Sequence, residues 1–193
     1  SAVSKVSNKK IFFYLAVALA LWYVILCFSH YLSRRPLWND EAAVFLSVEH
    51  FSPQEFFTQN LLNGQNFPRL HLFLIQQISK PFNFSLLSLR FLSFIFMLSA
   101  FFIWMKVARY EFKDDFYYFT YILCWCSSAL LIYYSAELKQ YSMDVLSSAL
   151  CVWFLYNQKR LEGSTKPLPY GLILGFLPAL LMFSYTTFFF FLI

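Results

Sequence analysis

Two acidic residues stand side by side directly after the first apolar run of the chain, in the stretch RRPLWNDEAAVF. A carboxylate at this place can serve as a general base that takes a proton from a hydroxyl. If Asp40 and Glu41 are helical, their side chains point about 100° apart, so one can face a site while the other caps the helix or meets solvent. The alternative is that both acids only offset the dipole of a helix beginning there. Spacing alone favours this alternative.

A second group of polar residues lies in the stretch YYSAELKQYSMD, which spans residues 133–144. Ser135 can cap a helix that carries Glu137 in its first turn, followed by Lys139 and Tyr141. Asp144 is then expected about one turn deeper. An acid at membrane depth is costly and is therefore a functional candidate. The alternative is a local ion pair between Lys139 and Glu137, with Asp144 bonded to a polar neighbour.

The composition of the chain decides which class of protein must position these groups. Of its 193 residues, 60% are hydrophobic and only 13% are charged, whereas soluble domains are about 25% charged. Because so few polar side chains cannot cover a globular surface, the composition predicts an integral membrane protein. The net charge is +5, but no basic block alternates with exposed aromatic residues, which argues against a nucleic-acid partner.

The cysteines and histidines do not form a disulfide or metal pattern. The cysteines lie inside apolar runs and are expected to be small buried side chains: Cys27, Cys124, Cys126 and Cys151. The histidines lack the spacing of metal ligands: His30, His50 and His71. We therefore predict no metal-binding residue. The cofactor stays unassigned, and a divalent metal is left open.

Five apolar stretches are long enough, at about 20 residues, to cross a bilayer. They cover Ile11–Phe28, Leu86–Val107, Phe116–Tyr134, Tyr141–Tyr156 and Tyr170–Ile193. With the N-terminus inside, nine basic side chains fall on the inner side and six on the outer side, as the positive-inside rule favours. The expected fold class is an all-α polytopic membrane protein with about five transmembrane helices. Both acidic clusters then lie on the outer face.

Residues 33–85 form the one long segment between the predicted spans, and their turn signals predict an outer loop with interfacial helices. A first helix is expected from Asn39 or Asp40 through Glu49. The stretch SPQE at residues 52–55 has the form of a capping box with proline at the first helical position. Asn63-Gly64 is a stop signal.

The stretch Leu70–Ile78 is too short to span a bilayer and contains two glutamines. It is expected to be an interfacial helix that starts near Pro68 and is stopped by Pro81. Residues 1–193 are expected to form a single transmembrane module. The absence of an initiator methionine and the apolar ending TTFFFFLI suggest a module cut from a longer polytopic protein.

On the outer face, the acidic clusters would lie near four arginines: Arg34, Arg35, Arg69 and Arg90. Transfer of a sugar from a polyprenyl phosphate carrier suits this combination. The acceptor hydroxyl needs one general base. The departing polyprenyl phosphate is already a stable anion, so it needs cations rather than a proton. Glycoside hydrolysis would instead need an acid and a base around one bond.

The order of these motifs resembles the large-fold (GT-C) membrane glycosyltransferases, in the branch of the protein O-mannosyltransferases and the lipid A aminoarabinose transferase. The resemblance rests on NDEA, FPRLHLFL, LSLRFLSFIFMLSA and above all LLIYYSAELKQYSMDVLSSAL, and it covers roughly residues 34 to 190. It implies that the chain is the N-terminal part of a longer protein, that Asp40 is the catalytic base and that Glu41 is its companion. Together with the charge argument, it gives the expected substrate-binding residues: Arg69, His71, Arg90, Tyr134, Glu137, Lys139 and Tyr141.

The resemblance also implies partners and a location. The partners are a polyprenyl-phosphate-linked sugar donor, an acceptor that is a lipid, a glycan or a protein, and the membrane lipids. The location is the bacterial inner membrane, with a cytoplasmic N-terminus and the site outside. The chain departs from the family pattern at Lys139, where arginine is usual; lysine can neutralise a phosphate but lacks the two-pronged donor. A non-catalytic lipid- or partner-binding subunit and a transporter remain alternatives.

Overall fold

The computed structural model describes residues 2–161 and Ser184, and these described residues are helical, without a strand. The α-helices are α1 (Ala2–Leu32), α2 (Asn39–His50), α3 (Glu55–Thr58), α4 (Arg69–Ser79), α5 (Leu86–Glu111), α6 (Asp115–Cys126), α7 (Ala129–Tyr134) and α8 (Tyr141–Leu161). Two short 3-10 helices are η1 (Leu62–Gly64) and η2 (Lys80–Phe82). The all-α prediction is confirmed for this part of the chain.

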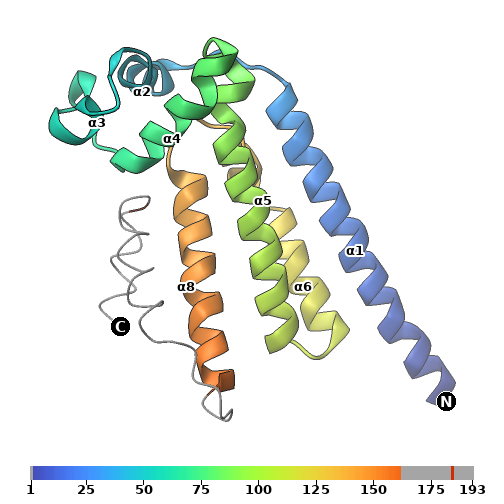
Figure 1. Cartoon of the computed structure of the whole chain (residues 1–193). Coiled ribbons are helices and arrows are strands. Elements are labelled where there is room, and N and C mark those ends of the chain that lie inside the picture. The colour runs from blue at the N-terminus through green and yellow to red at the C-terminus, as the bar shows by residue number, and fades with distance from the viewer. Residues whose placement is uncertain (1, 162–183, 185–193) are drawn as a thin grey trace.

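The helices α1, α5, α6 and α8 run side by side, and α2, α3 and α4 gather at one end of them, opposite the N-terminus (Figure 1). α5 packs against α8, and α1 packs against α6. We call residues 33–85 the cap segment, because their short helices cover this end. The first acidic pair lies in this cap segment, at the start of α2.

Two of the described helices are long and apolar enough to cross a membrane, namely residues Lys10–Leu32 within α1 and the whole of α5. The buried stripe of α1 recurs every three or four residues: Ala16, Ala20, Tyr23 and Cys27. Its other faces are apolar and exposed, for example at Trp22 and Ile25. A long helix with apolar side chains on its outer faces suits a lipid environment. Both observations support association with a membrane.

These two helices contain the predicted spans Ile11–Phe28 and Leu86–Val107. The predicted span Tyr141–Tyr156 lies within α8. α8 is not one of the two described helices that are long and apolar enough to cross a membrane. The predicted span Tyr170–Ile193 lies outside the described residues. The membrane-crossing helices that the described part of the chain supports are therefore α1 and α5.

The predicted span Phe116–Tyr134 is not one continuous helix. α6 ends at Cys126 and α7 begins at Ala129. Between them the Ser127 hydroxyl donates a hydrogen bond to the carbonyl of Cys124 at 3.1 Å, and such a local bond competes with the regular helical ladder. Ser128 then adopts extended backbone angles, φ −76° and ψ 101°. Two adjacent serines thus break the helix.

The prediction that Ser135 caps the next helix is also wrong. Ser135 ends α7, and its hydroxyl donates to the carbonyl of Ile132 at 2.6 Å. The next helix, α8, begins only at Tyr141. Residues 135–140 therefore form a connection that we call the 135–140 loop, and Glu137 belongs to this loop rather than to a first helical turn.

The local signals of the cap segment predicted α2 well, but they placed the start of the next helix, α3, too early in the chain. α2 starts at Asn39 and extends to His50, close to the expected range. The backbone N–H of Ser52 donates to the Glu55 carboxylate at 2.7 Å, which is one of the two bonds of a capping box. α3 nevertheless begins at Glu55, after Gln54 and without a side-chain cap, so Pro53 is not its first helical residue. Asn63 and Gly64 both have positive φ, at 56° and 64°. This left-handed conformation does not continue a right-handed helix, as expected at a helix stop.

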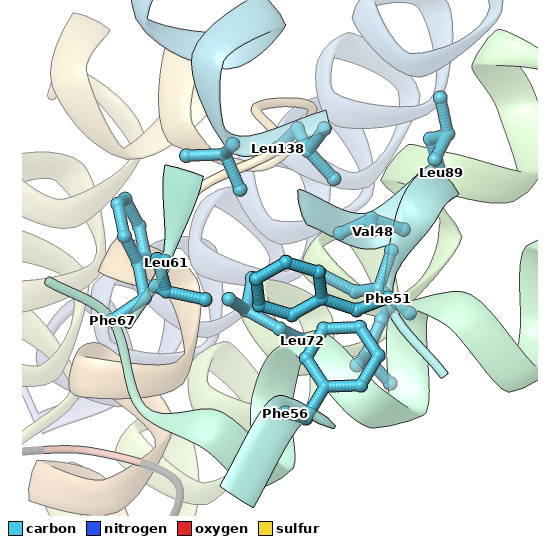
Figure 2. Packing of buried hydrophobic residues seen from close by; sticks show 11 residues of the cluster. Val48, Phe51, Phe56, Leu61, Phe67, Leu72, Leu89 and Leu138 are labelled. Carbon is cyan, nitrogen blue, oxygen red and sulfur yellow. The ribbon is translucent and has the colours of Figure 1, made fainter. Parts of the chain in front are cut away.

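The predicted helix Leu70–Ile78 corresponds to α4, which follows Pro68 and is succeeded by the short η2 helix containing Pro81. This helix and its neighbours bury a shared apolar core with α5 (Figure 2). The buried members are Val44, Val48, Phe51, Phe56, Leu61, Phe67, Leu72, Ile75, Leu89, Leu92 and Leu138. Leu138 comes from the 135–140 loop. Its complete burial fixes that loop against the cap segment.

The cysteines are free thiols, and three of them are buried: Cys27, Cys126 and Cys151. Cys124 is exposed on α6, so the expectation that all four are buried is wrong for this residue. Cys124 and Cys126 are two positions apart, which places them on different sides of a helix. Only Cys126 therefore reaches α1, where its thiol lies 3.5 Å from the carbonyl oxygen of Leu19.

Candidate functional site

A buried ion pair joins α2 to α5. The buried face of α2 carries Glu41, Val44, Ser47 and Val48, so helical periodicity turns Glu41 toward α5. Arg90 Nη2 lies 2.7 Å from Glu41 Oε2, and Arg90 Nε donates to Oε1 at 3.3 Å. The two side chains are 2% and 0% exposed. Charges removed from water in this way require good mutual geometry and further hydrogen bonds.

Backbone groups supply those further hydrogen bonds. The N–H of Leu138 donates to Glu41 Oε1 at 2.7 Å, and the N–H of Trp38 donates to Oε2 at 3.4 Å. Arg90 donates in turn to the carbonyls of Arg35 and Pro36, at 2.6 and 3.4 Å. The pair therefore ties the chain before α2 and the 135–140 loop to α5. Because both oxygens of Glu41 are engaged, this geometry suits a positioning residue better than a proton acceptor.

Asp40 points away from this buried pair. Its side chain is 62% exposed, and its Oδ2 accepts a hydrogen bond from Lys139 Nζ at 2.8 Å. Lys139 itself is only 11% exposed. Side chains at adjacent helical positions point about 100° apart. The carboxylate of Glu41 is therefore buried, while that of Asp40 remains accessible. The prediction that only one of the two acids faces a site is consistent with this arrangement.

Lys139 lies among groups that keep it charged. Burial acts to lower its pKa, but the hydrogen bond to Asp40 and the neighbouring Tyr141 and Glu137 raise the pKa above its ordinary value. The ammonium lies 5.7 Å from the centre of the Tyr141 ring, and that ring is 4.4 Å from the ring of Tyr134. The structure thus brings together three of the expected substrate-binding residues. The expected local pair of Lys139 with Glu137 is replaced by the pair with Asp40.

Glu137 is a buried carboxyl with one engaged oxygen. Trp38 Nε1 donates to its Oε1 at 3.3 Å, while its Oε2 is buried without a hydrogen-bond partner among the described residues. Ser93 holds its backbone carbonyl at 2.6 Å. Burial raises the pKa of Glu137, and the charge of Glu41 adds to this effect against the opposing bond from Trp38. A carboxyl in such surroundings can hold or pass a proton.

Arg35 is part of this site, although the sequence placed it only among the nearby cations. Its Nη1 donates to the Tyr133 hydroxyl at 2.8 Å, and its guanidinium lies 4.4 Å above the centre of the Tyr133 ring. Its Nη2 donates to the carbonyl of Ala136 and lies 3.8 Å from Glu41 Oε1. The only signal in the sequence was a cation close to two acids. Its aromatic partner is 98 residues away.

His71 and Arg69 lie on α4, outside the hydrogen-bonded group around Asp40. His71 is fully buried, packs on Phe96 at 6.1 Å between ring centres, and has no hydrogen-bond partner among the described residues at either ring nitrogen. One guanidinium nitrogen of Arg69 is also buried without such a partner. The structure therefore does not bring these two expected substrate-binding residues into contact with Asp40 or Lys139.

The burial of His71 predicts a pH dependence of stability. Burial lowers its pKa from 6.5 to about 4. As the pH falls, the unfolded chain takes up this proton first, so between pH 6.5 and 4 the folded state should lose on the order of 3 kcal/mol. Thermal unfolding as a function of pH measures this loss. His71→Phe should flatten the curve and His50→Gln, at an exposed position, should not; equal curves for both variants contradict the assignment.

Two further expectations concern Asp144 and metal ions. Asp144 Oδ1 accepts a hydrogen bond from the Ser184 hydroxyl at 2.5 Å, which matches the alternative of a polar neighbour. Within residues 2–161 and Ser184, no three His, Cys, Asp or Glu side chains come close enough to hold a metal ion.

No protein-family model, no curated protein and no solved structure matches this chain. The resemblance to the GT-C glycosyltransferases accordingly stays a prediction that rests on the residue patterns. The geometry around Asp40 is independent of that resemblance. It consists of an accessible carboxylate, an adjacent ammonium group and a buried ion pair that holds both supporting segments in place.

Proposed function

We propose that the protein is a membrane glycosyltransferase that moves a sugar from a polyprenyl phosphate carrier to a hydroxyl or amine of a lipid, glycan or protein acceptor. The observation that carries this proposal is the exposed Asp40 carboxylate, 2.8 Å from the Lys139 ammonium. Transfer from a phosphate carrier needs one base and one cation in reach of the same bond. The Glu41–Arg90 pair supplies a rigid support for both groups.

In this mechanism Asp40 accepts the proton of the acceptor hydroxyl as its oxygen attacks the anomeric carbon of the sugar. The bond between that carbon and the phosphate oxygen breaks, and its electron pair leaves with the polyprenyl phosphate. Lys139 stabilises the negative charge on this leaving group. Because the phosphate leaves as an anion, no second acid is needed. Before the donor binds, the two groups neutralise each other in the observed ion pair.

We place the site on the outer face of a bacterial inner membrane, with a cytoplasmic N-terminus and five crossings. The apolar helices α1 and α5 support the membrane part of this proposal, and the excess of basic residues at the predicted inner side supports its orientation. α6 and α7, which are separated by the break at Ser127, would together form one crossing of the membrane, and α8 would form another. The fifth, at residues 170–193, lies outside the described residues.

The test is transfer of labelled sugar from a panel of polyprenyl-phosphate-linked donors in membranes that contain the protein or lack it. Transfer that depends on the protein supports the proposal, and the successful donor identifies the sugar. A photoreactive polyprenyl phosphate is applied in parallel. Labelling without transfer from any donor would favour the alternative of a non-catalytic lipid-binding subunit. Movement of the intact lipid-linked sugar across the membrane would favour a transporter.

Lys139 should set the affinity for the donor. We expect Lys139→Gln to raise the KM for the donor about tenfold, because a hydrogen bond between charged groups contributes about 1.5–3 kcal/mol. Lys139→Arg should retain most of the affinity, since the charge remains. Steady-state kinetics over a range of donor concentrations measures the change. Lys80→Gln, at an exposed lysine of the cap segment, is the control, and an equal rise in both glutamine variants contradicts the role.

A further inference from the structure

A groove between α5 and α8 lies away from the candidate site. It has a volume of about 350 Å³ and is lined by Phe102, Ile103, Lys106, Leu150 and Trp153. This volume falls within the range of about 300–1,000 Å³ typical of ligand pockets. Phe102, Ile103 and Lys106 lie in the second half of α5, which runs away from the cap segment (Figure 1), and Leu150 and Trp153 lie on α8. The groove is therefore a separate feature from the Asp40 site.

One face of this part of α5 carries aromatic and basic side chains near the end of the helix. Phe102, Lys106 and Tyr110 recur every four residues and so share one face. Phe102 is 55% exposed, while Tyr110 stacks on Tyr156 of α8 at 5.8 Å between ring centres. Aromatic and basic side chains near the end of an apolar helix are typical of the place where a transmembrane helix leaves the hydrocarbon core.

Lys106 supplies a positive charge that the described part of the chain does not neutralise. Its ammonium is exposed and lies 5.7 Å from the centre of the Trp153 ring, and no carboxylate among the described residues forms an ion pair with it. By contrast, Arg109, one turn further along, is paired with Asp115 at 2.7 Å. A long lysine side chain can lie along the apolar groove and keep its charge at the rim. The rim of the groove thus favours an anion.

We propose that this groove binds one anionic phospholipid, with its phosphate at Lys106 and an acyl chain along Phe102 and Leu150. The walls are apolar apart from Lys106, which suits an amphipathic ligand better than a soluble anion. α5 is one of the two helices within residues 2–161 that are long and apolar enough to cross a membrane, so the groove would open to lipid. Basic pockets between transmembrane helices bind acidic headgroups in this way. The proposal rests on the membrane position of α5 and not on the transferase activity.

The experiment measures lipids retained by the full chain. The protein is purified in detergent micelles that contain equal amounts of phosphatidylglycerol and phosphatidylcholine, and bound lipid is counted by native mass spectrometry. Wild-type protein should retain phosphatidylglycerol in preference. Lys106→Gln should lower that preference about fivefold. Lys113→Gln removes an equal charge from an exposed lysine that does not line the groove, and it should leave the preference unchanged.

A second variant tests the apolar half of the site. Phe102→Ala should lower the retention of both lipids without changing their ratio, since it shortens the wall but leaves the charge. Three results would overturn the proposal: no preference in the wild type, an equal loss in the two lysine variants, or unchanged retention in Phe102→Ala. Displacement of the lipid by excess inorganic phosphate would also overturn it, because the groove would then be a site for a soluble anion.

Discussion

Replacing Glu41 with alanine is expected to lower the free energy of unfolding by about 3–5 kcal/mol, the usual effect of removing one partner of a buried ion pair. Arg90 would stay buried, at 2% exposure, without its counter-charge. The N–H of Leu138 would lose its acceptor at 2.7 Å and would also be left without a hydrogen bond. The 135–140 loop, which presents Lys139, would then lose its attachment to α2.

Denaturant titration of the purified protein in detergent, followed by tryptophan fluorescence, measures this loss. Glu49→Ala is the matched control, since Glu49 is an exposed acid of the same helix and should change stability by less than about 0.5 kcal/mol. The double variant Glu41→Met with Arg90→Met should recover much of the stability, because it removes both charges. Equal stability of Glu41→Ala and Glu49→Ala would show that the buried pair does not hold the cap segment.

Replacing Asp40 with asparagine is expected to lower kcat for sugar transfer at least about a hundredfold, since a general base contributes about 10²–10⁴-fold. Asparagine has nearly the same shape but cannot accept the proton of the acceptor. The side chain is 62% exposed, so the substitution should leave the fold intact. Loss of a group that acts only in the transition state lowers kcat and kcat/KM together.

The assay uses the donor that supports transfer by the wild type, with the variants at matched abundance in membranes. Glu49→Gln makes the same chemical change on the exposed surface of the same helix and should retain full activity. A rise in KM with unchanged kcat would assign Asp40 to donor binding instead. Asp40→Asn with wild-type activity would mean that this carboxylate only stabilises the start of α2.

Much of the local structure could be predicted from the sequence alone. Two of the apolar runs, Ile11–Phe28 and Leu86–Val107, predicted α1 and α5, because length and hydropathy are properties of a continuous stretch. In the cap segment, α2 and the short helix after Pro68 were predicted correctly, whereas α3 begins two residues later than the predicted first helical residue, Pro53. These signals act between residues at most a few positions apart, so no knowledge of the rest of the fold is needed.

Only the tertiary structure decided what the polar residues do. Spacing showed that Asp40 and Glu41 diverge, but not which of them is buried, since that depends on the packing of α2 against α5. Arg90 is 49 residues from Glu41, and Lys139 is 99 residues from Asp40. Partners at such distances are selected by the way the helices cross and by the burial of Leu138. The sequence by itself determined the long apolar helices α1 and α5 and most of the short helices of the cap segment. The packing of their apolar faces determined which carboxylate holds the fold and which one remains accessible.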